Sequence, residues 1–276
     1  MRILARTSRK TLRLPSVTLL QMETRHHHLA KLSIDDSMKA IEFGDVLIMS
    51  DKFNVLKAHG AKHVRVDDWP AKIGYSRALW YEVPQHIKTS HVLITQWDSW
   101  VIHPEFWKPQ FLNYDYIGAP WHYHDGFNVG NSGFSLRSKR LMDFLVEHEK
   151  EFPLDRDGED MMLSRIHRPK LEERGFAWAP EDLAFEFAVE TNCPRGMQAF
   201  GFHGLYHFPH VLSRIDLRVR AKHILTNEYM CNVQYINGNS MSEELLKEAP
   251  WLRSDMKTLE RRPQQVQVPR VTLTYE

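Results

Sequence analysis

The sequence predicts an α/β protein built around a mostly parallel sheet. Short β-rich runs at 15–23 and 45–50 flank the segment 26–41, in which apolar residues recur at helical spacing. Strand, helix and strand in that order are typical of a parallel βαβ unit. At 276 residues, 42% of them hydrophobic, the chain is long enough to bury one large core. We therefore expect a single domain flanked by helices, with a C-terminal extension.

A buried strand in the middle of the chain ends close to an isolated acid. The run HVRV at 63–66 predicts a third strand, and the apolar run at 91–95 predicts a further one, which is followed by Asp98. Ligands of open parallel sheets gather at the carboxyl ends of the strands. Asp98 is therefore expected at the edge of the sheet where a ligand binds.

The second half of the chain carries further helices and a last core strand. Ser138 is suited to cap a helix that follows the segment 128–138, and Pro180 is suited to the first turn of a helix at 180–190. The run 197–204 predicts the final core strand.

Three segments follow from this pattern. A basic segment at 1–14 precedes an α/β domain at 15–210, and a polar extension of helical or irregular structure occupies 211–276. The basic segment could dock on an anionic membrane surface, although a tail or strand with solvated charges is the favoured interpretation. Any membrane contact is therefore expected to be peripheral.

Composition excludes several classes of protein. The formal net charge is +1, with 36 basic and 35 acidic residues, so a broad surface for nucleic acid is not indicated. No run of about 18 apolar residues predicts a membrane span, and the first residues lack the apolar block of a signal peptide. Cys193 and Cys231 are too few for a disulfide framework. We expect a cytoplasmic protein.

Asp98 is the first candidate for a functional site. A carboxylate at a strand end suits a divalent cation that takes further oxygen ligands from a substrate phosphate. Gln96 lies two residues earlier, on the same strand face, and Ser99 adds a hydroxyl group. A single acid at a strand end is also typical of a turn or a cap, so both interpretations stay open.

A glycine-rich segment is the second candidate. Gly130 and Gly133 allow the backbone to approach a ligand closely, and the side chains between them, Asn131 and Ser132, offer hydrogen-bonding groups. A β-bulge that leads into a helix explains the same residues equally well. The glycine spacing differs from that of dinucleotide-binding and P-loop motifs.

Two Glu-Asp pairs are candidates for a general base. Glu181 and Asp182 follow Pro180, where acids in the first turn of a helix favour its dipole without any catalytic role. Glu159 and Asp160 also precede an apolar helix and could cap it. They follow a loop of the kind that carries an acceptor-activating base, however, so a catalytic role stays open for them.

One late histidine and several tryptophans complete the set. His203 lies between an apolar strand and a glycine, where it is either a satisfied structural histidine or a metal ligand. Trp97 and Trp121 offer platforms for a sugar ring or a nucleobase, but tryptophans also fill protein cores.

These motifs, in this order, resemble the nucleotide-sugar-dependent glycosyltransferases of the GT-A fold, which have a Rossmann-like sheet. The closer resemblance is to a family of mostly microbial proteins that is catalogued as a domain of unknown function and related to those enzymes. It covers roughly residues 15–205. The segments that carry it are HVLITQWDSW, YDYIGAPW, VGNSGFSLRS, GED, LEERGFAWAP, FAVE and FGFHG.

The resemblance implies roles for individual residues. In inverting enzymes of this fold, such as the β-1,3-galactosyltransferases and Fringe-like transferases, an Asp-x-Asp motif holds the metal on the donor diphosphate. Asp98 matches the second acid of that motif, and Gln96 replaces the first. His203 matches a late metal-ligand histidine, and Asp160 matches the catalytic base, with Asp182 as the alternative.

The same resemblance implies a cofactor and a set of binding residues. The cofactor is a divalent metal, Mn²⁺ or Mg²⁺, although Gln96 removes one negative charge and leaves the metal requirement open. Pro169 interrupts the helix after Asp160, where the family pattern is uninterrupted. The residues expected to bind donor or acceptor are Gln96, Trp97, Ser99, Trp121, Gly130, Asn131, Ser132, Gly133 and Phe134.

We therefore expect a glycosyltransferase that moves a sugar, with inversion, from a nucleotide-diphosphate donor to a glycan or other hydroxyl acceptor. A UDP-sugar is the expected donor. Two alternatives stay open. A non-catalytic module that binds nucleotide sugars or glycans would explain the missing first acid. A metal-dependent nucleotidyltransferase would need further clustered acids, and the sequence places none beside Asp98.

Overall fold

The structure is a computed structural model in which two compact units are distinguished, Met1–Val211 and Leu212–Glu276. It describes residues 12–39, 41–69, 71–155, 158–191, 193–226 and 240–253. Residues 1–11 of the basic segment at 1–14 lie outside the described residues, and so does Cys231.

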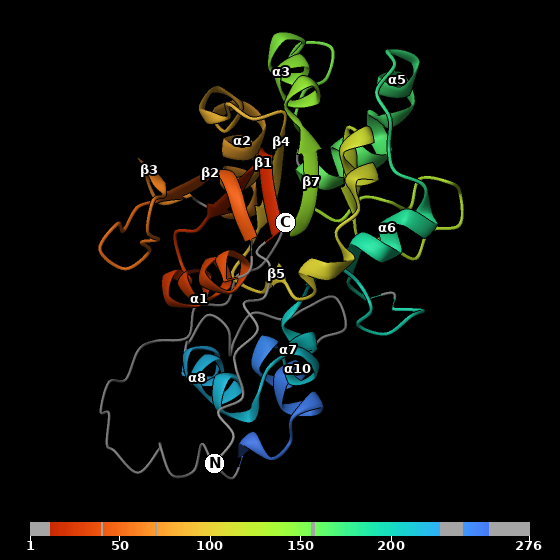
Figure 1. The fold of residues 1–276 in the computed structure, drawn as a ribbon. Coiled ribbons are helices and arrows are strands. Elements are labelled where there is room, and N and C mark those ends of the chain that lie inside the picture. Colours follow the sequence, from red (N-terminus) through yellow and green to blue (C-terminus); the bar gives the residue numbers. More distant parts are fainter. Residues whose placement is uncertain are drawn as a thin grey trace, which may run out of the picture. The chain divides into compact units, whose positions relative to one another are not determined.

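A six-stranded sheet forms the centre of the first unit (Figure 1). Its strands, in spatial order, are β3 (Lys62–Arg65), β2 (Ile41–Ser50), β1 (Leu12–Met22), β4 (His91–Thr95), β7 (Phe134–Ser138) and β6 (Tyr116–Gly118). The first four strands run parallel to their neighbours, whereas β7 runs antiparallel to both β4 and β6. The expected α/β class with a mostly parallel sheet is therefore confirmed. Because β1 pairs with β2 on one side and β4 on the other, the order of the chain reverses at β1.

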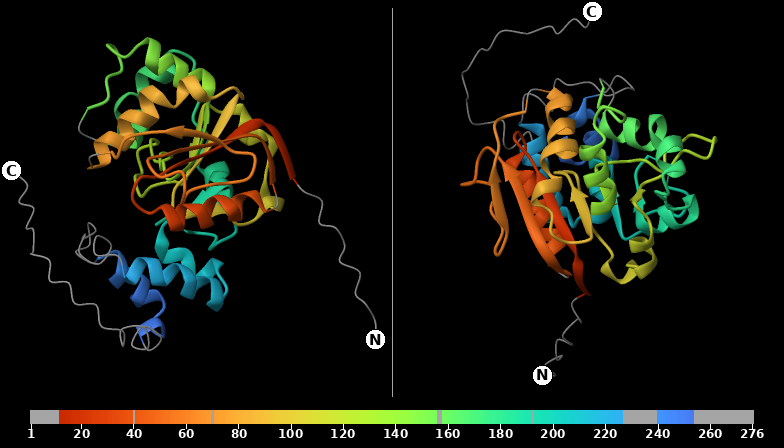
Figure 2. Two further views of the ribbon diagram at one scale, coloured as in Figure 1. Left: turned by 90° about the vertical axis from the view of Figure 1, so that its left-hand side faces the viewer. Right: turned by 90° about the horizontal axis from the view of Figure 1, so that it is seen from above.

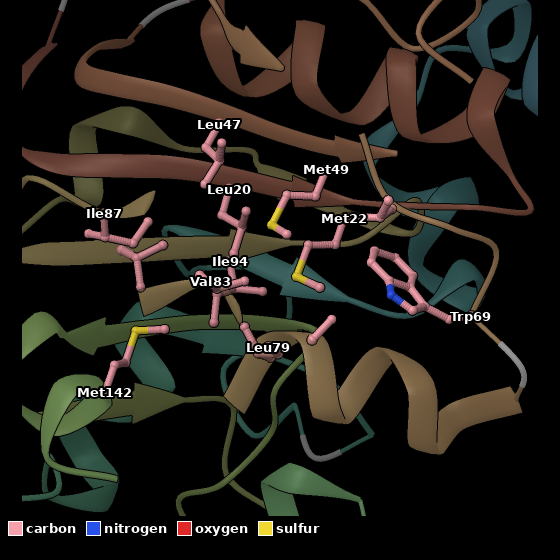
Figure 3. Packing of buried hydrophobic residues seen from close by; sticks show 13 residues of the cluster. Leu20, Met22, Leu47, Met49, Trp69, Leu79, Val83, Ile87, Ile94 and Met142 are labelled. Carbon is pink, nitrogen blue, oxygen red and sulfur yellow. The ribbon is translucent and has the colours of Figure 1, made fainter. Parts of the chain in front are cut away.

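Helices cover both faces of this sheet (Figures 1 and 2). One face carries α1 (His27–Met38), and the other carries α2 (Ala71–Arg77) and α3 (Lys139–Glu147). Figure 3 shows how Leu20, Leu47 and Ile94 of the central strands pack with Leu79 and Met142 of the covering segments. Burial of these aliphatic side chains stabilises the sheet by roughly 1.5–3 kcal/mol for each one, and it holds the strand ends in place.

A second, three-stranded sheet joins segments that are far apart in the sequence. Its order is β5 (Ser99–Val101), β9 (Gly201–His203) and β8 (Ala188–Val189). Strand β5 is antiparallel to β9, with Ser99 opposite His203, and β8 is parallel to β9. Because β5 follows β4 after a turn of three residues, this pairing brings His203 to the carboxyl end of β4.

Two helices in the second half of this unit begin where the sequence predicts, and one of them is shorter than expected. Ser138 caps α3 as expected, since its Oγ accepts a hydrogen bond from Leu141 N at 3.1 Å. The helix expected at 180–190 is shorter: α6 (Glu181–Phe187) has Pro180 at its N-cap and ends where β8 begins, because β8 pairs with β9.

Strand β1 starts earlier than expected, and the helix that follows Asp160 is interrupted before Pro169. Strand β1 begins at Leu12, before the expected residue 15. Helix α4 (Glu159–Met161) continues into a π-helical turn at 162–166, and α5 (Arg168–Glu173) starts anew with Pro169 in its first turn. The interruption therefore falls where proline, which has no N–H to donate, is tolerated.

The second unit contains two described helices, α8 (Arg214–Leu225) and α10 (Met241–Glu248). Ser240 and Glu243 form a reciprocal capping box at the start of α10. Trp251 packs beneath the guanidinium group of Arg214 at 4.7 Å. Within the part of the chain that is described, no helix is both long and apolar enough to cross a membrane.

Candidate functional site

The turn that carries Asp98 is fixed by hydrogen bonds within the protein. It joins β4 to β5, and the buried Ser99 holds it from two sides. Ser99 Oγ accepts a hydrogen bond from Gln96 N at 2.7 Å and donates one to Gly133 O at 2.6 Å. Ser99 thus ties the turn to the glycine-rich segment, and its hydroxyl group is already engaged.

Asp98 and His203 face each other at the carboxyl end of β4. Asp98 is 4% exposed, and its Oδ1 lies 3.5 Å from His203 Nε2. Among the described residues, none gives the buried Oδ1 a hydrogen bond of ordinary geometry, and the His203 ring is the group that faces it, in a long ion pair. A buried carboxylate needs a compensating charge, which protonated His203 supplies here and which a bound cation would have to replace.

Glu190 holds the opposite side of the His203 ring. Its Oε1 lies 2.9 Å from His203 Nδ1 and accepts a hydrogen bond from Asn131 Nδ2 at 2.7 Å. Sequence reasoning missed this residue. The only signal for it was the motif FAVE at 187–190, which carries part of the family resemblance and ends on Glu190.

The two carboxylates set the charge of the imidazole. Burial by itself would lower the pKa of His203, but the neighbouring charges of Asp98 and Glu190 outweigh it and raise the pKa to about 10. At neutral pH, His203 therefore carries a proton on each ring nitrogen. A cation that binds Nε2 has to replace that proton.

The glycines of the second candidate segment make room for protein side chains. A Cβ atom on Gly130 would lie 2.3 Å from the Trp121 ring, and one on Gly133 would lie 2.2 Å from His203 Nε2. Both distances are far below contact distance, so glycine is required at both positions. Tyr116 fixes the same segment, since its hydroxyl group lies 2.6 Å from Gly130 O.

Glu159 and Asp160 have different surroundings. Glu159 is 2% exposed and bonds to Ser132 Oγ, to Ser76 Oγ at 3.1 Å and to Arg137 Nη2 at 3.1 Å. Burial would raise the pKa of Glu159, but the Arg137 charge and the hydrogen bonds from Ser132, Arg137 and Ser76 together outweigh it and lower the pKa, so Glu159 is ionised. The Glu159 carboxylate is therefore paired within the protein. Asp160 is half-buried at the start of α4, and its Oδ1 accepts a hydrogen bond from Met161 N at 2.9 Å.

Asp182 lies on the protein surface. Its side chain is 93% exposed, at the first turn of α6, and its Oδ1 is 3.5 Å from Arg195 Nη2. Such an exposed pair contributes little, on the order of 0–1 kcal/mol. The setting agrees with an acid that favours the helix dipole.

Two of the aromatic candidates are core residues and one is half-buried. Trp97 is 8% exposed and packs edge-on against His26, with ring centroids 5.2 Å apart. Trp121 is half-buried between Gly130 and Tyr123. Phe134 is fully buried and packs against Phe187. Trp121 is therefore the member of this group whose ring borders both solvent and the glycine-rich segment.

The residues present fit a divalent cation with a small set of protein ligands. No group of three or more His, Cys, Asp or Glu side chains able to hold a metal occurs among the described residues. Asp98 and His203 nevertheless offer one oxygen and one nitrogen, and these two atoms face each other at 3.5 Å without a hydrogen bond of ordinary geometry between them. Mn²⁺ and Mg²⁺ commonly complete their coordination with water and substrate phosphate.

Fold and site together define an α/β protein with a carboxylate–imidazole pair at the carboxyl edge of its central sheet. Residues 72–203, just under half of the chain, match the model of a family described as "Protein of unknown function (DUF5672)". This match confirms the expected resemblance to a family of unknown function, and it spans both Asp98 and His203. No curated protein gives a significant match to the sequence.

Three solved structures are similar to this chain at low identity. A glycosyltransferase involved in the glycosylation of the major capsid of PBCV-1 has 14% identity and a TM-score of 0.45, over 74% of this chain and 97% of that one. The apo-form glycosyltransferase GlyE of Streptococcus pneumoniae TIGR4 has 10% identity and a TM-score of 0.43, over 87% and 64%. The mannosyltransferase PcManGT of Pyrobaculum calidifontis, in complex with GDP-Man and Mn²⁺, has 10% identity and a TM-score of 0.40, over 94% and 80%. Likeness at this level does not define an activity.

Proposed function

We propose that this protein is a divalent-metal-assisted glycosyltransferase, which moves a sugar from a nucleotide-diphosphate donor to a hydroxyl acceptor with inversion. The observation that carries the proposal is the buried Oδ1 of Asp98, which faces His203 Nε2 at 3.5 Å at the carboxyl end of β4. The domain that performs the reaction is the segment 15–210.

Asp98 and His203 are the residues that would hold the cation. Bound there, Mn²⁺ or Mg²⁺ would supply Lewis-acid stabilisation of the charge that develops on the departing diphosphate. Gln96, at the start of the same turn, contributes a neutral amide where an acid would add a second negative charge.

Asp160 is the proposed general base. In the transfer, the acceptor oxygen forms a bond to the anomeric carbon of the donor sugar while the bond from that carbon to the diphosphate oxygen breaks. The acceptor proton passes to the Asp160 carboxylate. Attack opposite the leaving group inverts the anomeric configuration, as in inverting glycoside hydrolysis. Glu159 cannot take this proton readily, because its carboxylate is already paired with the Arg137 guanidinium.

Trp121 and Asn131 are the proposed contacts for the donor or the acceptor. Trp121 is half-buried against Gly130, and its ring suits the apolar face of a sugar. Asn131 lies beside Glu190 and His203, so its amide borders the proposed cation site.

One observation favours a second candidate function, a non-catalytic module that binds a nucleotide sugar. Gln96 stands where the resembled enzymes have the first acid of their metal motif. A module of this kind would bind the donor without turnover, and replacement of Asp160 would leave its binding unchanged.

The proposal can be tested by donor hydrolysis even though the acceptor is not identified, because water can take the place of the acceptor hydroxyl group. The protein is incubated with UDP-glucose, UDP-galactose, UDP-N-acetylglucosamine or GDP-mannose in the presence of Mn²⁺. Released nucleoside diphosphate is measured, and the configuration of the released sugar is followed by proton NMR. The proposal requires slow release from one donor, with an inverted sugar, that Asp98→Asn abolishes. Binding of a donor without any release would favour the module instead.

A further inference from the structure

We propose that Glu190 is a positioning residue, which holds the His203 ring toward a cation at Asp98 and supplies the negative charge that Gln96 does not. This inference rests on the proposed function, because it assumes that a divalent cation binds between Asp98 and His203. It concerns a residue that the family resemblance left without a role.

The small sheet aligns the three residues across its strands. Strand β8 is parallel to β9, with Val189 opposite Phe202. Glu190 follows Val189 and His203 follows Phe202, so these two residues are also adjacent across the pair. On the other side of β9, His203 pairs with Ser99, which directly follows Asp98. Backbone pairing alone therefore sets Glu190 and Asp98 on opposite sides of His203.

Hydrogen bonding then fixes the orientation of the ring. With Nδ1 held by Glu190 Oε1 at 2.9 Å, Nε2 points at Asp98 Oδ1, 3.5 Å away. Asn131 Nδ2 donates to the same Glu190 oxygen at 2.7 Å, and so keeps the carboxylate in place. A carboxylate behind a metal-bound histidine fixes the ring and raises its basicity as a ligand.

The backbone of Glu190 is anchored separately from its side chain. Glu190 O lies 2.9 Å from His207 Nε2 and accepts a bond from Cys193 Sγ at 2.8 Å. A change in the Glu190 side chain therefore leaves these backbone contacts available, which favours a variant that folds.

Charge explains why a carboxylate is needed at this position. With a cation in place of the Nε2 proton, His203 would be neutral, and Asp98 would be the acid of this pair that could bind the cation directly. The Glu190 side chain is 16% exposed, so solvent screens its charge only in part, and that charge acts on the cation through the imidazole. Together the two acids balance a divalent ion, which Asp98 and a neutral Gln96 alone do not.

The test is a titration of the full-length protein with Mn²⁺ alone, in which free Mn²⁺ is read by electron paramagnetic resonance. The variants are Glu190→Gln, which keeps the shape and removes the charge, and Glu190→Asp, which keeps the charge. The matched control is Glu186→Gln, four residues earlier, where the carboxylate pairs with Lys108 and Arg195 on the surface. We expect Glu190→Gln to weaken Mn²⁺ binding about 10- to 100-fold, Glu190→Asp to weaken it less, and Glu186→Gln to leave it unchanged.

Two spectroscopic readouts separate positioning from general stability. In the wild type, electron spin echo modulation from a directly bound ¹⁴N nucleus is expected on Mn²⁺, and Glu190→Gln is expected to diminish it at an unchanged melting temperature. In protein labelled with ¹⁵N-histidine, the Nδ1 resonance of His203 is expected to shift in Glu190→Gln and not in Glu186→Gln.

The outcomes distinguish this inference from the proposed function. If Glu190→Gln binds Mn²⁺ as the wild type does and keeps the ¹⁴N coupling, the role of Glu190 is overturned while the metal site stands. If the wild type itself binds no Mn²⁺, the metal site fails, and the role of Glu190 fails with it.

Discussion

Gly133 lies directly against the His203 imidazole, so closely that a Cβ atom would come within 2.2 Å of Nε2. The backbone of the glycine-rich segment thus forms one wall of the proposed cation site. Ser99 Oγ donates to the carbonyl oxygen of the same glycine, which links the wall to the turn that carries Asp98.

Gly133→Ala should therefore displace the imidazole from Asp98. We expect a loss of Mn²⁺ binding together with a destabilisation of about 1–3 kcal/mol, the usual cost of an added methyl group in a packed site. The control is Gly175→Ala. Gly175 has φ +81° and open space around it, so alanine there costs about 1–2 kcal/mol of backbone strain without touching the site. Mn²⁺ titration and denaturant unfolding of both variants check this prediction, and intact Mn²⁺ binding by Gly133→Ala would contradict it.

Asp160→Asn should slow transfer and spare donor binding. Loss of a general base costs about 100-fold or more in turnover, whereas the neutral amide keeps the shape of the side chain. Asp182→Asn is the matched control, because Asp182 is exposed on α6 beside Arg195. Donor-hydrolysis rates and nucleotide affinities of the two variants are compared. A well-folded but inactive Asp182→Asn protein would transfer the role of base from Asp160 to Asp182.

Glu159→Gln should destabilise the protein strongly. It leaves the buried Arg137 guanidinium without its counter-charge, and breaking a buried ion pair costs about 3–5 kcal/mol. Glu151→Gln removes an exposed pair with Arg174 and should cost no more than about 1 kcal/mol. Urea unfolding measures both. Equal stability of the two variants would show that the buried pair does not hold the segment around Ser132 in place.

Acid should destabilise the protein through His26. Burial lowers the pKa of His26 from 6.5 to about 4. The charge of Asp98 opposes this shift, and the charges of Arg25 and His27 add to it. Between these values the unfolded chain binds a proton that the folded protein does not, so stability falls as the pH falls from about 6.5 to about 4, by at most ~1.4 kcal/mol per pH unit. Above pH 6.5 this residue contributes no pH dependence.

Replacement of His26 should reduce that slope. His26→Gln cannot take up the proton, so its stability at pH 5 and at pH 7 should differ less than that of the wild type. His122→Gln, on an exposed loop, is the control and should keep the wild-type difference. The measurement is urea unfolding of the three proteins at the two pH values, and an unchanged slope for His26→Gln would refute the assignment.

Local patterns in the sequence were sufficient to predict the four parallel strands of the central sheet and the position of Asp98, but β6 and β7 were not predicted as strands. The apolar run before Asp98 has the length and composition of a buried strand, and the structure places β4 there. Ser138 was predictable as a cap because capping depends on residues within one turn of each other.

Contacts between distant segments were not predictable in the same way. Glu190 is brought to His203 by β8, a strand of two residues that is too short to show an alternating pattern of apolar and polar residues in the sequence. Gly130 and Gly133 were predicted to allow close approach of a ligand or a sharp turn, and nothing in the sequence indicated that Trp121 and His203 lie where Cβ atoms of these glycines would be. Those neighbours are set by tertiary packing, which no local window of the sequence contains.

The most direct measurement is a calorimetric titration of UDP, GDP and CMP, each with Mn²⁺ and with chelator, into the wild type and Asp98→Asn. The proposed site requires that one nucleotide binds the wild type with Mn²⁺, that chelator abolishes this binding, and that Asp98→Asn loses it while it stays folded. Equal nucleotide affinity with Mn²⁺ and with chelator in the wild type would contradict the role of Asp98 as a metal ligand. Absence of binding by all three nucleotides would contradict the glycosyltransferase proposal itself.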